Sequence, residues 1–410
     1  MRAFALAVLA VALAACAGKP TPAAPAPAKP ASAEPKPKFD FHALVKREAG
    51  LTKPFRVDAP DGSWSATISA VAPPKVRETA ADSVSLDVDI GSERPLDCVV
   101  WKQRLDAATT LAKLTFEPVA KLPLKEIARI EVGVEEGSPN VTFDMFGVNE
   151  RKEANHVKTT LVMRPHWTLG CRHDELGYAE TVRSTALQLG RTFSPTTSPD
   201  TSRYHDVSIV RIGEMSLGYV ERFFYDAAAG GGVEIEFGAL VGPRKDAAPV
   251  FQDSALVSET DAAGLLRTSL EIVATADGVE RSHKLERKSA QEYAVSGTDK
   301  GKEVRGVLKA KRPLRGERLL AGDIAAHAAA GGRSAFVRER WAPTDATIAP
   351  HYDSYTPVAG FDAAHPSYVL DDGKSKATVT FDRRGILMKQ SIAIGEQLLV
   401  FAKVFSHGTL

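Results

Sequence analysis

The feature of this 410-residue chain that most limits its possible folds is an alternation of apolar and polar residues that recurs along most of its length. In one stretch, Trp64, Ala66, Ile68 and Ala70 alternate with two serines and a threonine. Successive side chains of a β-strand point to opposite faces of the sheet, so a period of two predicts strands with one buried face. We therefore expect a chain built mainly from antiparallel sheets.

Residues 39–193 are predicted to form an α+β domain. The patterns indicate strands at residues 84–90, 98–101, 128–134, 141–148, 157–163 and 166–171, and helices at residues 106–114 and 176–189. Strands bracketed by helices in this order favour an antiparallel sheet with helices on one face. In element order alone, this arrangement resembles that of PsbP-like proteins; no sequence motif accompanies the resemblance.

A run rich in serine, threonine and proline separates this region from the rest, and we place a hinge at residues 194–203. Residues 204–410 read as a series of hairpins, with a strong two-residue turn signal at Asp277-Gly278 and one helix at residues 319–330. The expected second domain is mainly β, either a curved antiparallel sheet or an open barrel. The inner face of such a sheet must be covered by side chains, a helix or a ligand.

One face of the first predicted hairpin of this second domain is strongly apolar. Its members are Leu217, Tyr219, Phe223, Tyr225, Val233, Ile235 and Phe237. Two interpretations remain open. The face holds a lipid or another apolar ligand, or it is buried in a closed hydrophobic core.

The cysteines favour a disulfide in the first domain. The chain has three cysteines, and Cys98 and Cys171 remain as a pair once Cys16 is set aside for the N-terminal motif described next. A bridge between them would close a loop of about 73 residues and would destabilise the unfolded chain by roughly 4 kcal/mol. The alternative is two buried thiols.

The N-terminus has the outline of a secretory signal: Arg2 is followed by an uncharged apolar run and small residues. The tetrapeptide Leu13-Ala14-Ala15-Cys16 resembles the lipobox of bacterial lipoproteins. The resemblance implies that residues 1–15 are a removed signal peptide and that Cys16 carries acyl chains that anchor the protein in a membrane. It also implies a bacterial cell-envelope location, and Ala17 resembles the outer-membrane sorting pattern.

Residues 16–38 are predicted to be the lipidated cysteine followed by a linker rich in proline and alanine. No large apolar residue occurs in the linker, so it cannot bury enough surface to offset the entropy of ordering. We expect a solvated spacer between membrane and folded domains.

Charge and motifs exclude several function classes. Lysine and arginine total 52, aspartate and glutamate total 51, and the net charge of +1 gives no indication of a nucleic-acid partner. Phosphate-binding loops and the GxSxG, HExxH, CxxC and EF-hand patterns are absent, so no catalytic residue, cofactor or metal is predicted.

Two polar clusters are candidate sites. Asp174 and Glu175 are interpreted as caps for the helix that follows, in preference to a metal site formed by His166, His173 and Glu175. Residues 341–366 are expected to be a long surface loop, and an alternative hypothesis places a hydrolase or metal site among its polar residues. These are His351, Asp353, Ser354 and His365.

The sequence therefore favours a non-catalytic binding or scaffolding lipoprotein of the envelope. Its expected partners are the membrane, through the acyl chains on Cys16, and another envelope protein or a lipid. One alternative is a carrier of a lipid or other apolar ligand in the second domain. The other is a hydrolase of an unrecognised type.

Overall fold

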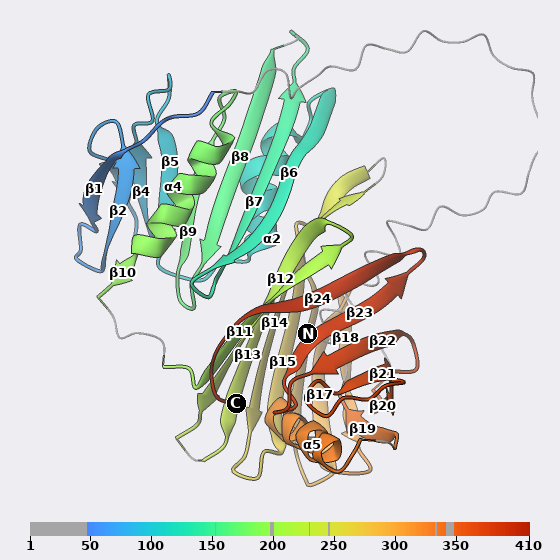
Figure 1. Cartoon of the computed structure of the whole chain (residues 1–410). Coiled ribbons are helices and arrows are strands. Elements are labelled where there is room, and N and C mark those ends of the chain that lie inside the picture. Colours follow the sequence, from blue (N-terminus) through green and yellow to red (C-terminus); the bar gives the residue numbers. More distant parts are fainter. Residues whose placement is uncertain are drawn as a thin grey trace, which may run out of the picture.

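A computed structural model describes residues 47–151, 153–196, 201–228, 230–244, 247–332, 334–341 and 348–410. The predicted signal peptide, Cys16 and the linker lie outside these residues. The described chain forms two sheet-rich domains that pack against one another (Figure 1). Within the described ranges, no helix has both the length and the apolar character needed to span a bilayer.

Ten strands form the first domain. They are β1 (Lys53–Asp58), β2 (Trp64–Ala70), β3 (Lys75–Thr79), β4 (Ser83–Val88), β5 (Leu96–Trp101), β6 (Leu124–Glu135), β7 (Ser138–Val148), β8 (Ala154–Met163), β9 (Thr168–His173) and β10 (Ser194–Pro195). Seven make one antiparallel sheet in the order β3-β4-β5-β9-β8-β7-β6, and the other three make a small sheet, β1-β2-β10. The predicted α+β architecture is confirmed.

Helices cover both faces of the larger sheet, so the expectation of helices on one face only is wrong. Helix α2 (Ala107–Leu111) continues through a π-helical turn (Ala112–Phe116) into α3 (Glu117–Ala120), so this helical segment is longer than predicted. Helix α4 (Ala179–Thr192) packs on β2, β8 and β9. Neighbouring residues of β8 separate the two faces: Leu161 belongs to the cluster around α2, and Val162 to the cluster around α4.

The predicted capping of α4 is wrong. Tyr178 takes a left-handed conformation (φ 61°), so the helix begins only at Ala179. Its first amide groups are capped from elsewhere: Glu48 accepts hydrogen bonds from the backbone N–H groups of Glu180 (3.1 Å) and Thr181 (2.8 Å). Asp174 and Glu175 instead bind Arg94, as an ion pair and as a backbone acceptor respectively.

The predicted disulfide joins neighbouring strands. Cys98 on β5 lies directly opposite Cys171 on β9, with a Cα–Cα distance of 4.1 Å, and both residues are buried. The bond belongs to the buried cluster that the larger sheet forms with α4 and the small sheet.

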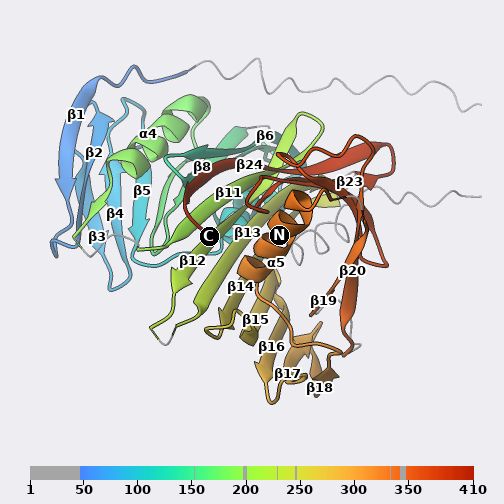
Figure 2. The same ribbon diagram turned by 60° about the horizontal axis from the view of Figure 1, so that its bottom comes forward.

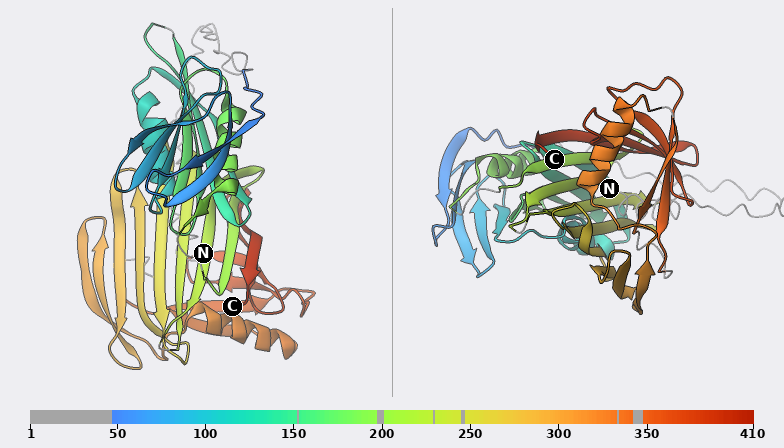
Figure 3. Two further views of the ribbon diagram at one scale, coloured as in Figure 1. Left: turned by 90° about the vertical axis from the view of Figure 1, so that its left-hand side faces the viewer. Right: turned by 90° about the horizontal axis from the view of Figure 1, so that it is seen from below.

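One antiparallel sheet of fourteen strands forms the second domain. Its strands are β11 (Tyr204–Ile212), β12 (Met215–Asp226), β13 (Gly232–Arg244), β14 (Ala247–Thr260), β15 (Leu266–Thr275), β16 (Gly278–Arg287), β17 (Glu292–Asp299), β18 (Lys302–Lys309), β19 (Phe336–Arg340), β20 (His351–Pro357), β21 (Ser367–Asp371), β22 (Lys376–Phe381), β23 (Leu387–Ile394) and β24 (Gln397–Gly408). The order is β18-β17-β16-β15-β14-β13-β12-β11-β24-β23-β22-β21-β20-β19. The sheet curls without closing, since β18 and β19 remain its two edges (Figures 2 and 3). The mainly-β, open architecture is confirmed.

The described part of the second domain has one helix, α5 (Glu317–Ala329), which lies across the concave side of this sheet (Figure 3, right). Leu320 and Ile324 of α5 pack into a buried cluster with Tyr355, Tyr368 and Phe381 from the strands around them. The expectation of a long loop at residues 341–366 is wrong in part, because β20 occupies residues 351–357; residues 342–347 lie outside the described chain.

The two domains share one hydrophobic cluster, called here the interdomain cluster. It joins the helical segment 107–120, the sheet of the first domain and the outer face of the second-domain sheet. Representative members are Leu111, Phe143, Leu161, Tyr219 and Phe251. The helical segment is thus held between the two sheets.

Candidate functional site

Part of the apolar face predicted from the hairpin β12–β13 lies against the first domain. Tyr219 belongs to the interdomain cluster, and Phe237 lies under the guanidinium of Arg104, 4.2 Å from the ring centroid. Phe223 is buried against the stacked ring of His205, and Ile235 is half-buried beside it on β13.

The remaining members, Leu217, Tyr225 and Val233, lie elsewhere. The register between β11 and β12 shifts at Leu217, which therefore points into the inner cluster around α5. Tyr225 and Val233, at the end of the hairpin, line a pocket beyond α5. Leu217, Tyr219, Phe223, Ile235 and Phe237 line neither this pocket nor the cavity described next.

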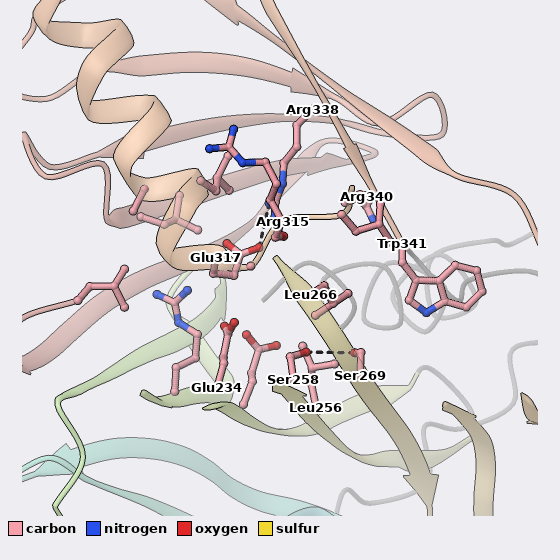
Figure 4. Close-up of a pocket in the computed structure, with 18 of the residues that line it drawn as sticks. Glu234, Leu256, Ser258, Leu266, Ser269, Arg315, Glu317, Arg338, Arg340 and Trp341 are labelled. Carbon is pink, nitrogen blue, oxygen red and sulfur yellow. Dashed lines mark hydrogen bonds and ion pairs between the residues drawn. The ribbon is translucent and has the colours of Figure 1, made fainter. Parts of the chain in front are cut away.

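The opposite, concave face of the sheet contains a polar cavity of about 140 Å³. Strands β13 to β15 form its floor, and its walls include the start of α5, strand β19 and the connection between β22 and β23 (Figure 4). The pocket lined by Tyr225 and Val233, about 230 Å³, adjoins it through shared residues, among them Glu234, Ser258 and Glu317.

Three carboxyl groups face the cavity from its floor: Glu234 and Glu236 on β13, and Glu271 on β15. Glu271 is only 2% exposed, yet neither of its carboxylate oxygens has a hydrogen-bond partner among the described residues. Burial raises the pKa of Glu271 to about 7, although Arg281 favours its ionised form. Burial, reinforced by the nearby Glu317, raises the pKa of Glu234 to about 8.

The four arginines of the lining each have an acidic partner. The pairs are Arg222–Asp206, Arg315–Asp323, Arg338–Glu317 and Arg340–Asp353. By contrast, Glu234 forms no hydrogen bond or ion pair with any described residue, and Figure 4 shows it facing Glu317 across the cavity. The positive charge around the cavity is therefore already matched, and carboxyl groups are in excess.

A neighbouring buried network shows what a fully paired carboxylate looks like in this fold. Arg222 Nε and Nη2 donate to Asp206 Oδ1 and Oδ2 (3.0 and 2.6 Å), and Tyr204 and Lys403 contact the same carboxylate. Burial opposes ionisation of Asp206, but Arg222 and Lys403 outweigh it and hold its pKa at about 2. Glu271 lacks any such set of donors.

The polar residues weighed for a hydrolase or metal site do not converge. Asp353 is fully buried and bound to Arg340, while the exposed His365 pairs with Asp362. Ser354 lies next to Asp353 on β20 and therefore points to the other face of the sheet. Among the described residues, no group of three or more histidine, cysteine, aspartate or glutamate side chains could hold a metal ion.

Comparisons with known proteins add two distant likenesses. No protein-family model matches the chain, and no curated protein matches it. A β-barrel-like protein of the domain of unknown function DUF1849 from Brucella abortus is 11% identical with a TM-score of 0.38, and the match covers 51% of this chain and 98% of that one. Cyanobacterial PsbP (CyanoP) from Synechocystis sp. PCC 6803 is 11% identical with a TM-score of 0.25, covering 36% of this chain and 94% of that one.

The acidic residues of the cavity could not be recognised from the sequence. Their alternation with apolar residues predicts side chains that face solvent, whereas the structure places them in the cavity. Glu234 and Glu236 alternate with Val233, Ile235 and Phe237, a pattern typical of solvent-facing acids. A separate signal concerns the apolar face: Glu221 is its single charged residue. Its partner, Arg104, lies in the other domain.

Proposed function

We propose that this protein is a lipid-anchored, non-catalytic binding protein of the bacterial cell envelope, with a small polar ligand held in the concave cavity of its second domain. The observation that carries the binding role is Glu271, a buried carboxyl group that lines the cavity without a hydrogen-bond partner. Burying a polar group without a partner costs free energy. A ligand that supplies a donor recovers this cost.

The lining supports binding rather than catalysis. Ser258 and Ser269 are its only hydroxyl groups of serine or threonine among the described residues, and they hydrogen-bond to each other at 3.1 Å. The described lining contains no histidine or cysteine, so it offers no nucleophile beside a histidine base.

The charges of the lining favour a polar ligand over the apolar ligand first considered for this domain. Most of the apolar face of β12 and β13 is occupied by packing against the first domain or against neighbouring rings. The face left for a ligand is the one that bears Glu234, Glu236 and Glu271.

The anchor is supported by the lipobox-like tetrapeptide that ends at Cys16. A proline-rich linker of about 22 residues could hold the folded domains up to roughly 70 Å from the membrane. Replacement Cys16→Ala should move the protein from the membrane fraction to the soluble envelope fraction. A variant that stays in the membrane would overturn this part of the proposal.

The binding role is tested on the mature chain purified from membranes of its host. Native and denaturing mass spectra should differ by one small molecule per chain, and Glu271→Gln should reduce the occupancy. A bare mass in every preparation, together with a stable crosslinked protein partner, would favour the scaffolding alternative instead.

A further inference from the structure

The inference concerns the chemical class of the ligand, and it rests on the proposed binding function. Each arginine of the cavity is engaged by an acid, whereas Glu234 and Glu271 have neither an ion pair nor a hydrogen bond among the described residues. A buried carboxyl group in this state either stays protonated or pairs with a cation. An anionic ligand would meet these carboxyl groups and find no free arginine.

Glu271 sets a geometric requirement of its own. Both of its oxygens are buried and unpartnered, so the ligand must carry N–H or O–H donors that reach the floor of the cavity. The two arginines that favour the ionised form of Glu271, Arg281 and Arg340, are each engaged by another acid, Asp299 and Asp353 respectively. Neither of them contributes a hydrogen bond to Glu271.

A metal ion does not meet the requirement. Metal sites in proteins need several converging ligands, and the described residues hold no such group. The cation must therefore be larger than a metal ion, so that it fills part of the cavity.

The other residues of the lining indicate the chemistry of the uncharged part of the ligand. Around the carboxyl groups the cavity is lined by aliphatic and aromatic side chains, of which Leu256, Leu266, Leu320, Phe381 and Trp341 are examples. Figure 4 shows Leu256 and Leu266 beside the serine pair, with Trp341 at one side. Such a lining suits a short hydrocarbon chain next to the charged group.

We propose that the cavity binds an organic cation: a primary ammonium group on a short aliphatic chain, with the ammonium directed at Glu271 and Glu234. The ammonium group supplies three donors to carboxylates that have none. The chain lies against the leucines and Trp341.

The test uses three probes of equal chain length on the full mature protein in detergent, followed by isothermal titration calorimetry. The probes are 1,6-diaminohexane, 1,6-hexanediol and adipate; each has six carbons, and they end in ammonium, hydroxyl and carboxylate groups respectively. The diamine should bind, and the diol and the dianion should bind at least tenfold more weakly, because hydrogen bonds to charged groups are the stronger ones.

Two variants locate the binding. Glu271→Gln keeps the shape of the side chain and removes its charge, and it should weaken binding of the diamine about tenfold or more. Glu259→Gln is the matched control: Glu259 is exposed on β14 and points away from the cavity, so this variant should bind like the wild type. Circular dichroism of each variant establishes that it is folded.

The source of the ammonium group is separated with two further probes. Spermidine represents a free amine, and vesicles of phosphatidylethanolamine, compared with phosphatidylcholine vesicles, represent a lipid headgroup that bears the same group. Binding of either, with the same loss in Glu271→Gln, supports the inference and identifies the source.

Two results would overturn the inference, and they differ in what they leave standing. If the diol or adipate binds as tightly as the diamine and the binding depends on Glu271, the cavity is a binding site but its ligand is not a cation. If diamine binding is unaffected by Glu271→Gln, the binding lies outside the cavity. If the native mass spectrum also shows no bound ligand, the two results together contradict the proposed binding function itself.

Discussion

Arg104 of the first domain donates a hydrogen bond to Glu221 of the second, and the two side chains are 7% and 0% exposed. His205 Nε2 lies 2.9 Å from the other carboxylate oxygen of Glu221, and Phe237 lies below the guanidinium. Both domains therefore contribute charge to one buried contact.

Replacing Arg104 should uncouple the domains. Arg104→Ala leaves Glu221 buried with only His205, and removing one member of a buried pair costs about 3–5 kcal/mol. Urea unfolding should show this loss, with a transition that broadens or divides as the interdomain cluster opens. The matched control is Arg56→Ala, in an exposed pair with Asp58, which should unfold like the wild type. An equal effect of the two variants would contradict the role given to Arg104.

A second contact between the domains caps a helix. Asp253 on β14 accepts hydrogen bonds from the backbone N–H groups of Ala108 (2.9 Å) and Thr109 (2.8 Å) in the first turn of α2. Asp106, the N-cap residue by position, makes no such bond. Asp253→Ala should reduce the free energy of unfolding by about 1–2 kcal/mol, the usual cost of losing a cap. Asp106→Ala is the control in the same turn. A larger loss of unfolding free energy in Asp106→Ala than in Asp253→Ala would show that Asp253 is not the cap.

The strands could be predicted from the sequence, but the faces they present could not. Alternation along β12 and β13 shows that two faces exist and which is apolar. It does not show which face becomes concave or where the first domain packs, because both depend on how the whole fourteen-stranded sheet curls. Tyr219 and Phe237 consequently meet Arg104 instead of a ligand, while the acidic positions Glu234 and Glu236 line the cavity.

Sequence signals next to a helix mispredict its cap when a residue distant in the sequence provides the cap. The helix α4 has acids just before it, as a capped helix should, yet its cap is Glu48, over 130 residues away. The cysteine pair was predictable because cysteine count and export context need no geometry. The cavity residues Glu271 and Arg340 belong to strands far apart in the chain, and no spacing in the sequence links them.

The disulfide gives a prediction that needs no ligand. The double variant Cys98→Ala, Cys171→Ala should lose about 2–4 kcal/mol in unfolding free energy, because the unfolded chain is no longer constrained. Denatured, unreduced wild-type protein should show almost no free thiol on residues 47–410, and reduction should release two. Two free thiols per chain before reduction would show that the native protein has no disulfide between these cysteines.

The acids of the cavity should make stability depend on pH in a defined direction. Burial raises the pKa of Glu234 to about 8 and that of Glu271 to about 7, both above the value of about 4.5 that a glutamate has in an unfolded chain. Between these values the folded state binds more protons than the unfolded state. The free energy of unfolding of the ligand-free protein should therefore fall as the pH rises from about 5 to 8.

Glu271→Gln isolates one of these acids. Glutamine stays neutral, so the unfolding free energy of the variant should exceed that of the wild type by a margin that is smallest near pH 5 and has grown by roughly 1–3 kcal/mol at pH 8. Arg281 and Arg340 favour the ionised form of Glu271 and Glu236 opposes it, so the difference between the two pH values measures their balance against burial. Glu259→Gln, exposed on β14, should keep the wild-type pH profile. If Glu271→Gln runs parallel to the wild type from pH 5 to 8, Glu271 is ionised in the folded protein throughout, and it must then have a partner that already satisfies it.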